Sequence, residues 1–289
     1  MSDAAIPVLP HVRVLRERYA VWLCDVWGVV HNGVAAFPDA CDALLRFREQ
    51  GGRVSLITNS PRPSEIVVRQ LAKLNVPRET YDAIVSSGDI TRGVIKDREG
   101  ESLFHLGPQR DRPIFDGLKV REAPVQSADY VVCSGLYNDE VDKPEDYRDQ
   151  LDIMRERGLF MVCANPDRVV ERGDKLIYCA GAIADLYASM GGEVLYAGKP
   201  YAPIYEQALA WAEAKSGRKL QRERILAIGD SLRTDFTGAR DFGVDFLFVT
   251  SGIHAEEFGA RHAPDEAALQ KMFSAAGGTP KALMQRLIW

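Results

Sequence analysis

One continuous apolar run constrains the fold of this chain more than any other feature. The run Tyr19-Ala20-Val21-Trp22-Leu23-Cys24 ends at Asp25. An unbroken run of this kind is typical of a strand that is buried on both faces of a parallel sheet. We therefore expect an α/β protein in which Asp25 lies at the carboxyl end of a buried strand.

Strand and helix patterns alternate in both halves of the chain. In the first half an amphipathic stretch opens at Pro38-Asp39, stops at Gly51-Gly52, and leads to an apolar strand at 53–57 and a helix start at Pro63-Ser64. The later elements are a helix at 202–215, a strand at 225–228, a helix at 234–242 and a strand at 246–249. This βαβ alternation predicts one doubly wound parallel sheet.

The middle of the chain carries a pattern of its own. Apolar strands are expected at 130–133 and 159–163, with a charged helix at 145–157. A structureless loop of this length is uncommon in a compact domain. We therefore predict a catalytic core of residues 1–97 and 194–289, interrupted by an inserted α/β cap domain of residues 98–193. The last stretch, 277–289, is expected to form a short terminal helix.

Charge and hydropathy exclude some partners. The formal net charge is −5 and no dense Lys/Arg run appears, so we expect neither nucleic acid nor a membrane as a partner. The first residues lack the pattern of a signal peptide, and no apolar run approaches the roughly 18 residues of a spanning helix. These features predict a cytoplasmic protein, and they leave a homodimer open.

The cysteines do not suggest a disulfide framework or a metal site. They are five in number, far apart, and free of C-x-x-C spacing: Cys24, Cys41, Cys133, Cys163 and Cys179. Reduced, buried thiols are the simplest interpretation.

Four expected strand ends each present a distinctive polar side chain. These are Asp25, Thr58, Lys199 and Asp230. Ligands of open α/β sheets bind at the carboxyl ends of the strands. Two carboxylates, a hydroxyl and an ammonium group could together hold Mg²⁺ against a phosphoryl group. The set indicates phosphoryl-transfer chemistry.

The segments around these residues resemble the four ordered motifs of the haloacid-dehalogenase superfamily hydrolases. The segments are Asp25-Val26-Trp27-Gly28-Val29, Thr58-Asn59-Ser60, Gly198-Lys199-Pro200 and Gly229-Asp230-Ser231-Leu232-Arg233-Thr234-Asp235. The residues of these motifs, with a cap between the second and third motifs, resemble those of class II subtype A. This subtype includes p-nitrophenyl, phosphoglycolate and pyridoxal phosphatases. The resemblance runs from about Trp22 to Val249. Two further segments, Asn165-Pro166-Asp167 and Ala180-Gly181-Ala182, resemble cap elements of that subtype.

The resemblance implies a Mg²⁺-dependent phosphatase that acts on a small phosphorylated substrate. Asp25 would attack phosphorus and form an aspartyl-phosphate, which divides one difficult displacement into two easier ones. Thr58, Asn59 and Lys199 would bind the phosphoryl group, with Thr58 and Lys199 also serving catalysis by offsetting developing charge.

The same resemblance implies the metal ligands. Mg²⁺ would be held by Asp25, the backbone carbonyl of Trp27 and Asp230, and Asp235 would orient this metal site. An aspartate after a buried strand can also be a simple turn or capping residue. The four motifs together make the catalytic interpretation the stronger one.

Trp27 departs from the usual pattern. Phosphatases of this superfamily usually carry aspartate two positions after the nucleophile, as general acid toward the leaving group and general base toward water. Indole can do neither, and general acid–base catalysis is typically worth about 10²–10⁴-fold. Nearby, His31 and Asn32 are interpreted as a surface turn rather than a proton carrier, and Asn165 and Asp167 as turn residues rather than substrate contacts.

Three alternatives differ in class. The chain could be a phosphometabolite-binding protein that lost turnover with the missing acid–base aspartate. It could be a dehalogenase-like hydrolase, in which halide leaves without protonation and no metal is needed. A dinucleotide-dependent enzyme is disfavoured, because no Gly-x-Gly-x-x-Gly follows any expected strand.

Overall fold

The computed structural model describes residues 5–172, 175–251, 259–260, 263–264 and 266–289. The chain divides into two compact units. The first unit comprises Met1–Thr58, Arg69–Val85 and Tyr205–Trp289, and the second comprises Asn59–Val68 and Ser86–Ile204. These borders lie outside the expected cap limits of 98 and 193, because the elements that flank the cap strands associate with them. The division into catalytic core and cap at those limits stays a prediction.

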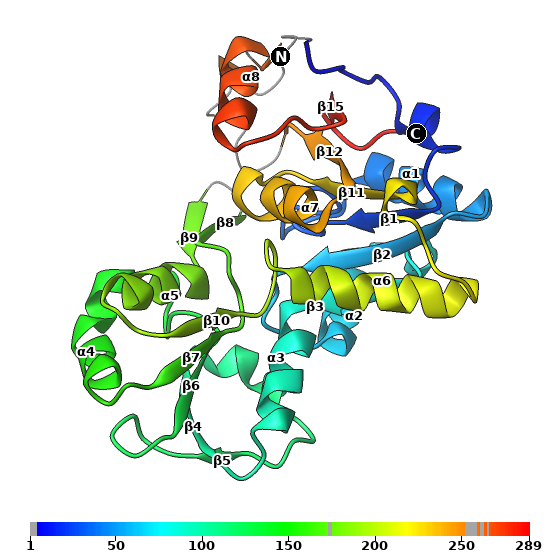
Figure 1. Cartoon of the computed structure of the whole chain (residues 1–289). Helices are drawn as coiled ribbons and strands as arrows, with labels where there is room; N and C mark the ends of the chain where they lie inside the picture. The colour runs from blue at the N-terminus through cyan, green and yellow to red at the C-terminus, as the bar shows by residue number, and fades with distance from the viewer. Residues whose placement is uncertain (1–4, 173–174, 252–258, 261–262, 265) are drawn as a thin grey trace. The chain divides into compact units, whose positions relative to one another are not determined.

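A six-stranded sheet forms the centre of the first unit (Figure 1). In sheet order its strands are β15 (Ala282–Met284), β12 (Asp245–Val249), β11 (Ile225–Gly229), β1 (Val21–Cys24), β2 (Arg53–Thr58) and β3 (Ala83–Ser86). The pairs from β15 through to β2 are parallel, with Cys24 opposite both Leu56 and Ile228. From β1 the strand order runs one way through β2 and the other way through β11. This order confirms a doubly wound α/β fold.

The apolar run behaves as its pattern predicts. All four residues of β1 are buried. Trp22 stacks on Phe47 of α1 (Pro38–Glu49), with 3.7 Å between ring centroids. Helix α1 presents its buried residues, including Leu44 and Phe47, on one face, so its amphipathic pattern covers the sheet.

The expected terminal helix at 277–289 is wrong. Residues Ala282–Met284 form the edge strand β15, which pairs in parallel with β12. Gly277 has a left-handed φ of 78° and lies two residues after the end of α8 (Glu266–Ala275). The three apolar residues of β15 are buried, so tertiary pairing decides a segment that is too short for periodicity to classify.

A second, five-stranded sheet lies in the second unit. Its order is β10 (Val194–Tyr196), β7 (Phe160–Cys163), β6 (Tyr130–Cys133), β4 (Ser102–Leu106) and β5 (Arg121–Glu122). Every neighbouring pair is parallel. The middle segment therefore builds an α/β layer structure rather than a long loop, which agrees with the predicted fold class.

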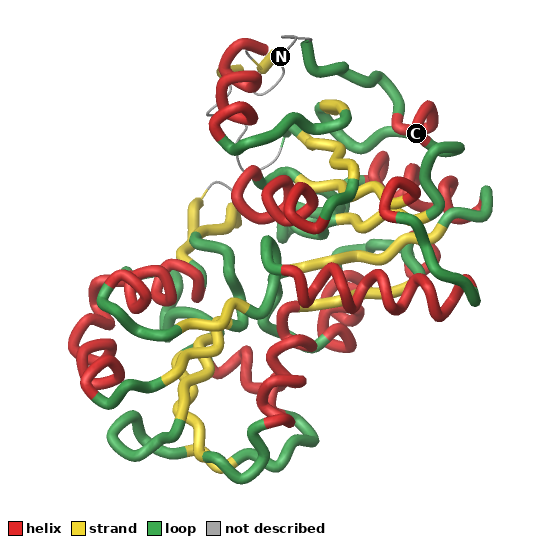
Figure 2. The backbone as a smooth tube through the Cα atoms, viewed as in Figure 1, coloured by secondary structure: helices red, strands yellow, loops and turns green. Residues whose placement is uncertain are grey.

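Further helices and two short hairpins complete the structure (Figure 2). The helices are α2 (Ser64–Lys73), α3 (Ser87–Asp97), α4 (Arg148–Glu156), α5 (Ala180–Ser189), α6 (Ala202–Ser216) and α7 (Thr237–Phe242). Short hairpins pair β8 (Val169–Arg172) with β9 (Lys175–Tyr178), and β13 (Gly259–Ala260) with β14 (Ala263–Pro264). Among the described helices, none is both long and apolar enough to cross a membrane. All five cysteines are buried free thiols, as expected.

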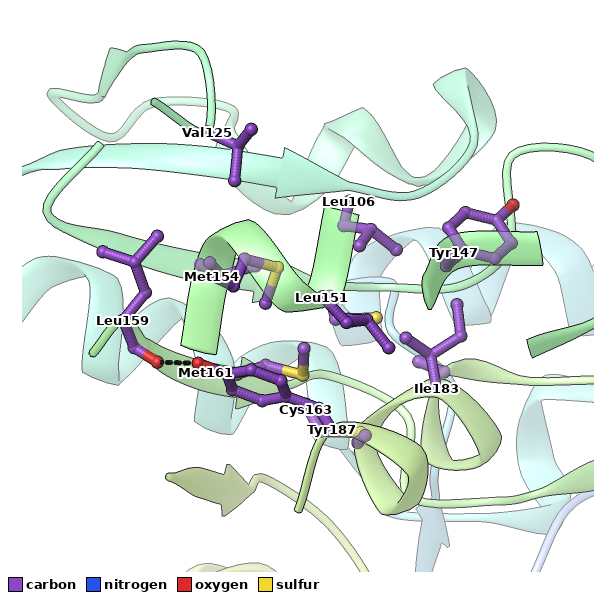
Figure 3. Packing of buried hydrophobic residues seen from close by; sticks show 14 of the residues in the cluster. Leu106, Val125, Tyr147, Leu151, Met154, Leu159, Met161, Cys163, Ile183 and Tyr187 are labelled. Carbon is purple, nitrogen blue, oxygen red and sulfur yellow. Dashed lines mark hydrogen bonds between the residues drawn. The ribbon is translucent and has the colours of Figure 1, made fainter. Parts of the chain in front are cut away.

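The core of the second unit packs around both faces of its sheet. On one face, residues of α4 and α5 such as Leu151, Met154 and Ile183 meet the strand residue Met161 (Figure 3). On the other face, Ile95 of α3 packs with apolar residues of β4, β6 and β7. Burial of both faces explains the unbroken apolar strands of this segment.

Removing one buried hydrogen bond tests this core. The Tyr187 hydroxyl donates to the Leu159 carbonyl at 2.6 Å, and both residues are buried (Figure 3). Tyr187→Phe leaves that carbonyl without its phenolic donor, so the free energy of unfolding should fall by about 1–3 kcal/mol. Urea unfolding followed by circular dichroism measures the loss. Tyr178→Phe, at a side chain that is 41% exposed, is the control and should leave the curve unchanged; equal curves for both variants would contradict the prediction.

Candidate functional site

Three of the predicted residues lie at the carboxyl ends of adjacent strands. Asp25 follows β1, Thr58 is the last residue of β2, and Asp230 follows β11, which pairs with β1. The Asp25 amide continues the ladder by donating to the Ile228 carbonyl at 2.8 Å. All three side chains are buried. The sheet therefore places them at the edge where open α/β folds bind ligands.

Three carboxylates gather at this edge. Ligand oxygens of Asp25, Asp230 and Asp235 lie within 4.8 Å of one another, and all three residues are buried. Carboxylates that close together repel one another, and removal from water adds a further cost unless an opposite charge is bound. Oxygen donors of this kind are the ligands that a hard divalent cation prefers. The residues present therefore fit a small divalent cation.

Local backbone geometry leaves room for these carboxylates. A Cβ on Gly28, whose φ is +86°, would lie 2.0 Å from Oδ2 of Asp230. A Cβ on Gly229 would lie 2.2 Å from Cγ of Asp235. Both glycines therefore stand where any side chain would displace a carboxylate of the cluster.

Asp235 is held by the turn that follows β11. Its Oδ2 accepts from the Ser231 amide at 3.1 Å, and the Ser231 hydroxyl accepts from the Thr234 amide at 3.3 Å. The helix expected at 234–242 begins instead with a π-helical turn, Leu232–Phe236, before α7. Such turns are rare and are frequently found at functional sites.

The Trp27 indole packs on the loop that follows the first motif. A Cβ on Gly33 would lie 2.5 Å from Cζ2 of Trp27, so the ring lies directly over this glycine. Its edge meets the His31 ring, with 5.1 Å between centroids and planes 70° apart. Trp27 thus has a packing role within this loop.

His31 is not the surface residue that its sequence context suggested. It is 1% exposed, and burial lowers its pKa to about 4. Its Nδ1 accepts from the Gly33 amide at 2.9 Å. The imidazole is therefore neutral at pH 7. Asn32 does form the expected exposed turn, because its Oδ1 accepts from the amides of Val34 and Ala35.

The other predicted residues belong to the second unit. Asn59 is 3% exposed and Lys199 is 2% exposed. The Asn59 side chain binds the backbone of Lys199, and its Nδ2 also donates to Oδ1 of Asp167 at 3.0 Å. Asn165 accepts from the Asp167 amide at 3.1 Å, as a turn residue does. The predicted phosphate contacts of Thr58, Asn59 and Lys199 stay predictions.

Two buried carboxylates of the second unit were missed by sequence reasoning. Asp111 pairs with Arg62 at 3.3 Å, and burial raises its pKa despite that arginine. Burial would also raise the pKa of Asp139, but hydrogen bonds from Arg110 and Arg172 outweigh it and lower the pKa. Single charged residues in irregular segments carry no periodic signal, so the sequence offered no means of finding these pairs.

A crevice with a mixed polar and apolar lining opens at the carboxyl ends of β4 and β5. Its volume is about 420 Å³. Its lining includes Gln109, Arg112, Glu122 and Tyr137. Arg112 and Glu122 form an ion pair with each other, so the charges at this crevice largely offset one another.

Comparison with known proteins places the chain in a family. Residues 22–121 match the family described as "Haloacid dehalogenase-like hydrolase", and residues 196–270 match a related "HAD-hydrolase-like" family. A solved structure of a hydrolase of the haloacid dehalogenase-like family from Brucella suis is 45% identical. The similarity covers 97% of this chain and 100% of that one, with a TM-score of 0.87.

More distant relatives carry more specific names. The 5'-nucleotidase YutF of Bacillus subtilis is 22% identical over 83% of this chain and 91% of its own length. The ribonucleotide monophosphatase NagD of Escherichia coli is 24% identical over 80% and 87%. A 4-nitrophenylphosphatase from Thermotoga maritima shares the fold, with a TM-score of 0.69 and 23% identity over 94% and 96% of the two chains. The fold, the acidic cluster and these similarities lead to one conclusion: the chain belongs to the haloacid dehalogenase-like hydrolase family.

Proposed function

We propose that this hydrolase is a Mg²⁺-dependent phosphatase that cleaves a small phosphorylated metabolite through an aspartyl-phosphate on Asp25. The observation that carries the proposal is the cluster of three buried carboxylates that follow β1 and β11, with the buried Thr58 at the carboxyl end of the neighbouring strand β2. The distant relatives named as nucleotidase, ribonucleotide monophosphatase and nitrophenylphosphatase all act, by those names, on phosphate esters. Their shared chemistry supports the substrate class.

The acidic cluster would hold the cation. Asp25 and Asp230 would be direct ligands, with the Trp27 carbonyl as a third, and Asp235 would orient the group through its own hydrogen bond to the Ser231 amide. When bound, Mg²⁺ would neutralise negative charge on the phosphoryl oxygens and on the carboxylates.

The first chemical step belongs to Asp25. One carboxylate oxygen attacks phosphorus, the bond from phosphorus to the ester oxygen breaks, and the leaving group departs with that bond's electron pair. Thr58 would donate a hydrogen bond to the transferring phosphoryl group, and the Lys199 ammonium would offset its charge. In the second step water attacks the aspartyl-phosphate, which releases inorganic phosphate and restores Asp25.

In these steps, neither Trp27 nor His31 provides a general acid that could protonate the leaving group. Trp27 supplies no acid, and the neutral His31, whose Nδ1 is already hydrogen-bonded to Gly33, is not an imidazolium donor at pH 7. The substrate should therefore carry a leaving group that departs without much protonation, such as an aryl oxide or a carboxylate.

The two rival activities are less well supported. A phosphometabolite-binding protein that kept the carboxylate cluster would bind its ligand without measurable turnover, whereas the relatives are named for phosphatase activities. A dehalogenase needs no metal, so Asp230 and Asp235 would have no cation to bind there. Cleavage of phosphate esters that requires Mg²⁺, together with no cleavage of haloacids, would distinguish a phosphatase from both rivals.

Gly28→Ala tests the cation site. The new Cβ would meet the Asp230 carboxylate, and a left-handed conformation itself costs a residue with a Cβ about 1–2 kcal/mol. Affinity for Mn²⁺, used as a paramagnetic substitute for Mg²⁺, should fall at least about tenfold, or 1.4 kcal/mol. The control is Gly93→Ala, on a helical and exposed glycine with open space around its Cα. Unchanged Mn²⁺ binding in Gly28→Ala would argue against the site.

Asp25→Asn and Thr58→Ala test the division of catalytic roles. Asp25→Asn removes the nucleophile, so turnover of p-nitrophenyl phosphate should fall to background. Thr58→Ala removes one stabilising donor and should lower kcat by about 10²-fold. Wild-type turnover in Asp25→Asn would rule out covalent catalysis through this residue.

The missing acid at position 27 predicts a steep dependence on leaving-group pKa. Aryl and acyl phosphates should react far faster than alkyl phosphates, and a burst of leaving group should precede steady turnover if hydrolysis of the aspartyl-phosphate is slow. A plot of log kcat/KM against leaving-group pKa measures this. A flat plot, with chemistry shown to be rate-limiting, would mean that another residue supplies the proton.

A further inference from the structure

The Asn59 side chain forms a two-sided clasp on the backbone of Lys199. Its Oδ1 accepts from the Lys199 amide at 2.7 Å, and its Nδ2 donates to the Lys199 carbonyl at 3.1 Å. Both bonds are buried, and they connect residues 140 positions apart in the sequence. One side-chain amide thus engages both main-chain polar atoms of Lys199, three residues beyond the end of β10 at Tyr196.

Asp167 sets the orientation of this amide. Its Oδ1 accepts a second hydrogen bond from Nδ2 of Asn59 at 3.0 Å. Asp167 is in turn held by the start of α5, where the Gly181 amide donates to its carbonyl at 3.0 Å. A Cβ on Gly181 would lie 2.5 Å from that carbonyl oxygen, so the turn sits against a glycine that permits the contact.

The three neighbours of the Asn59 side chain specify asparagine. The Lys199 amide can only donate a hydrogen bond, whereas the Lys199 carbonyl and an ionised Asp167 can only accept one. Position 59 therefore needs one acceptor and two donors within a single short side chain. Aspartate offers no donor and would face Asp167 with a like charge, and a longer glutamine would not reach the same atoms.

Gly198 supplies an independent sign that the clasp is tight. A Cβ at this position would lie 2.4 Å from Oδ1 of Asn59 and 2.9 Å from the Ser87 hydroxyl. Its backbone is not in the left-handed region, so space rather than conformation requires glycine there. The glycine of the Gly-Lys-Pro motif thus leaves the space in which Asn59 reaches the backbone of Lys199.

We propose that Asn59 is a positioning residue for Lys199, with Asp167 orienting Asn59, rather than a ligand of the phosphoryl group. Fixing both main-chain polar atoms of Lys199 fixes the origin of its side chain, and with it the place of the ammonium group. The catalytic consequence rests on the proposed function, in which Lys199 offsets phosphoryl charge. A displacement of about 1 Å in such a group can cost about 10²-fold in rate.

An exchange of the two side chains tests the positioning role. Asn59→Asp should lower kcat for p-nitrophenyl phosphate by about 10²-fold, with little change in KM, because it removes both donors and adds repulsion. Asp167→Asn alone should cost little, since Asn59 can still donate to its oxygen. The double variant Asn59→Asp with Asp167→Asn restores a hydrogen bond between the two positions and should recover at least about tenfold, or 1.4 kcal/mol. A double variant no better than Asn59→Asp, or an Asn59→Asp variant that raises KM at unchanged kcat, would overturn the proposal.

Amide hydrogen exchange tests the clasp without any assay of activity. In Asn59→Ala the Lys199 amide loses its acceptor and should exchange faster, whereas Asn59→Asp keeps an acceptor and should keep the amide protected. Gly198→Ala should also speed the exchange, and Gly93→Ala is the folded control. An unchanged Lys199 exchange rate in Asn59→Ala would overturn the clasp, even if the enzyme is active. A wild-type protein that cleaves no phosphate ester would instead contradict the proposed function, and the exchange result would still decide the clasp.

Discussion

The mutual repulsion of three buried carboxylates is the constraint around which the first unit is organised. Asp25, Asp230 and Asp235 stand within 4.8 Å of one another at the ends of two paired strands. Such a group is unfavourable in isolation and becomes favourable once a cation is shared among its oxygens. Parallel pairing of β1 with β11 brings the first two together, and the π-helical turn after β11 brings in the third. Glycines at 28 and 229 provide the space.

Much of the fold could be predicted because its strands are buried on both faces. The apolar runs at 19–24, 130–133 and 225–228 form the parallel strands β1 (Val21–Cys24), β6 (Tyr130–Cys133) and β11 (Ile225–Gly229). The segment at 277–289 could not be predicted, because a three-residue edge strand is too short to show a period and is selected by pairing with β12. The helix expected at 145–157 is found as a 3₁₀ turn, Pro144–Tyr147, followed by α4 at Arg148–Glu156.

The part of the site that depends on residue type and on position at a strand end could be predicted from the sequence. The aspartates at strand ends could be found because their position follows from the strand pattern. The environment of His31 could not, because burial of a loop residue depends on how the loop folds back over Trp27 and Gly33. The clasp of Asn59 on Lys199 joins positions 140 residues apart. The local sequence around either residue does not indicate that the two are in contact.

One of the borders between the two units falls on the peptide bond between Thr58 and Asn59. Thr58 is the last residue of its segment in the first unit, and Asn59 is the first of its segment in the second. One of these neighbours ends a strand of the main sheet, and the other holds the main chain of Lys199. No residue therefore separates the end of β2 from the side chain that holds Lys199. An extra residue between Thr58 and Asn59 would displace either the end of β2 or the side chain that holds Lys199.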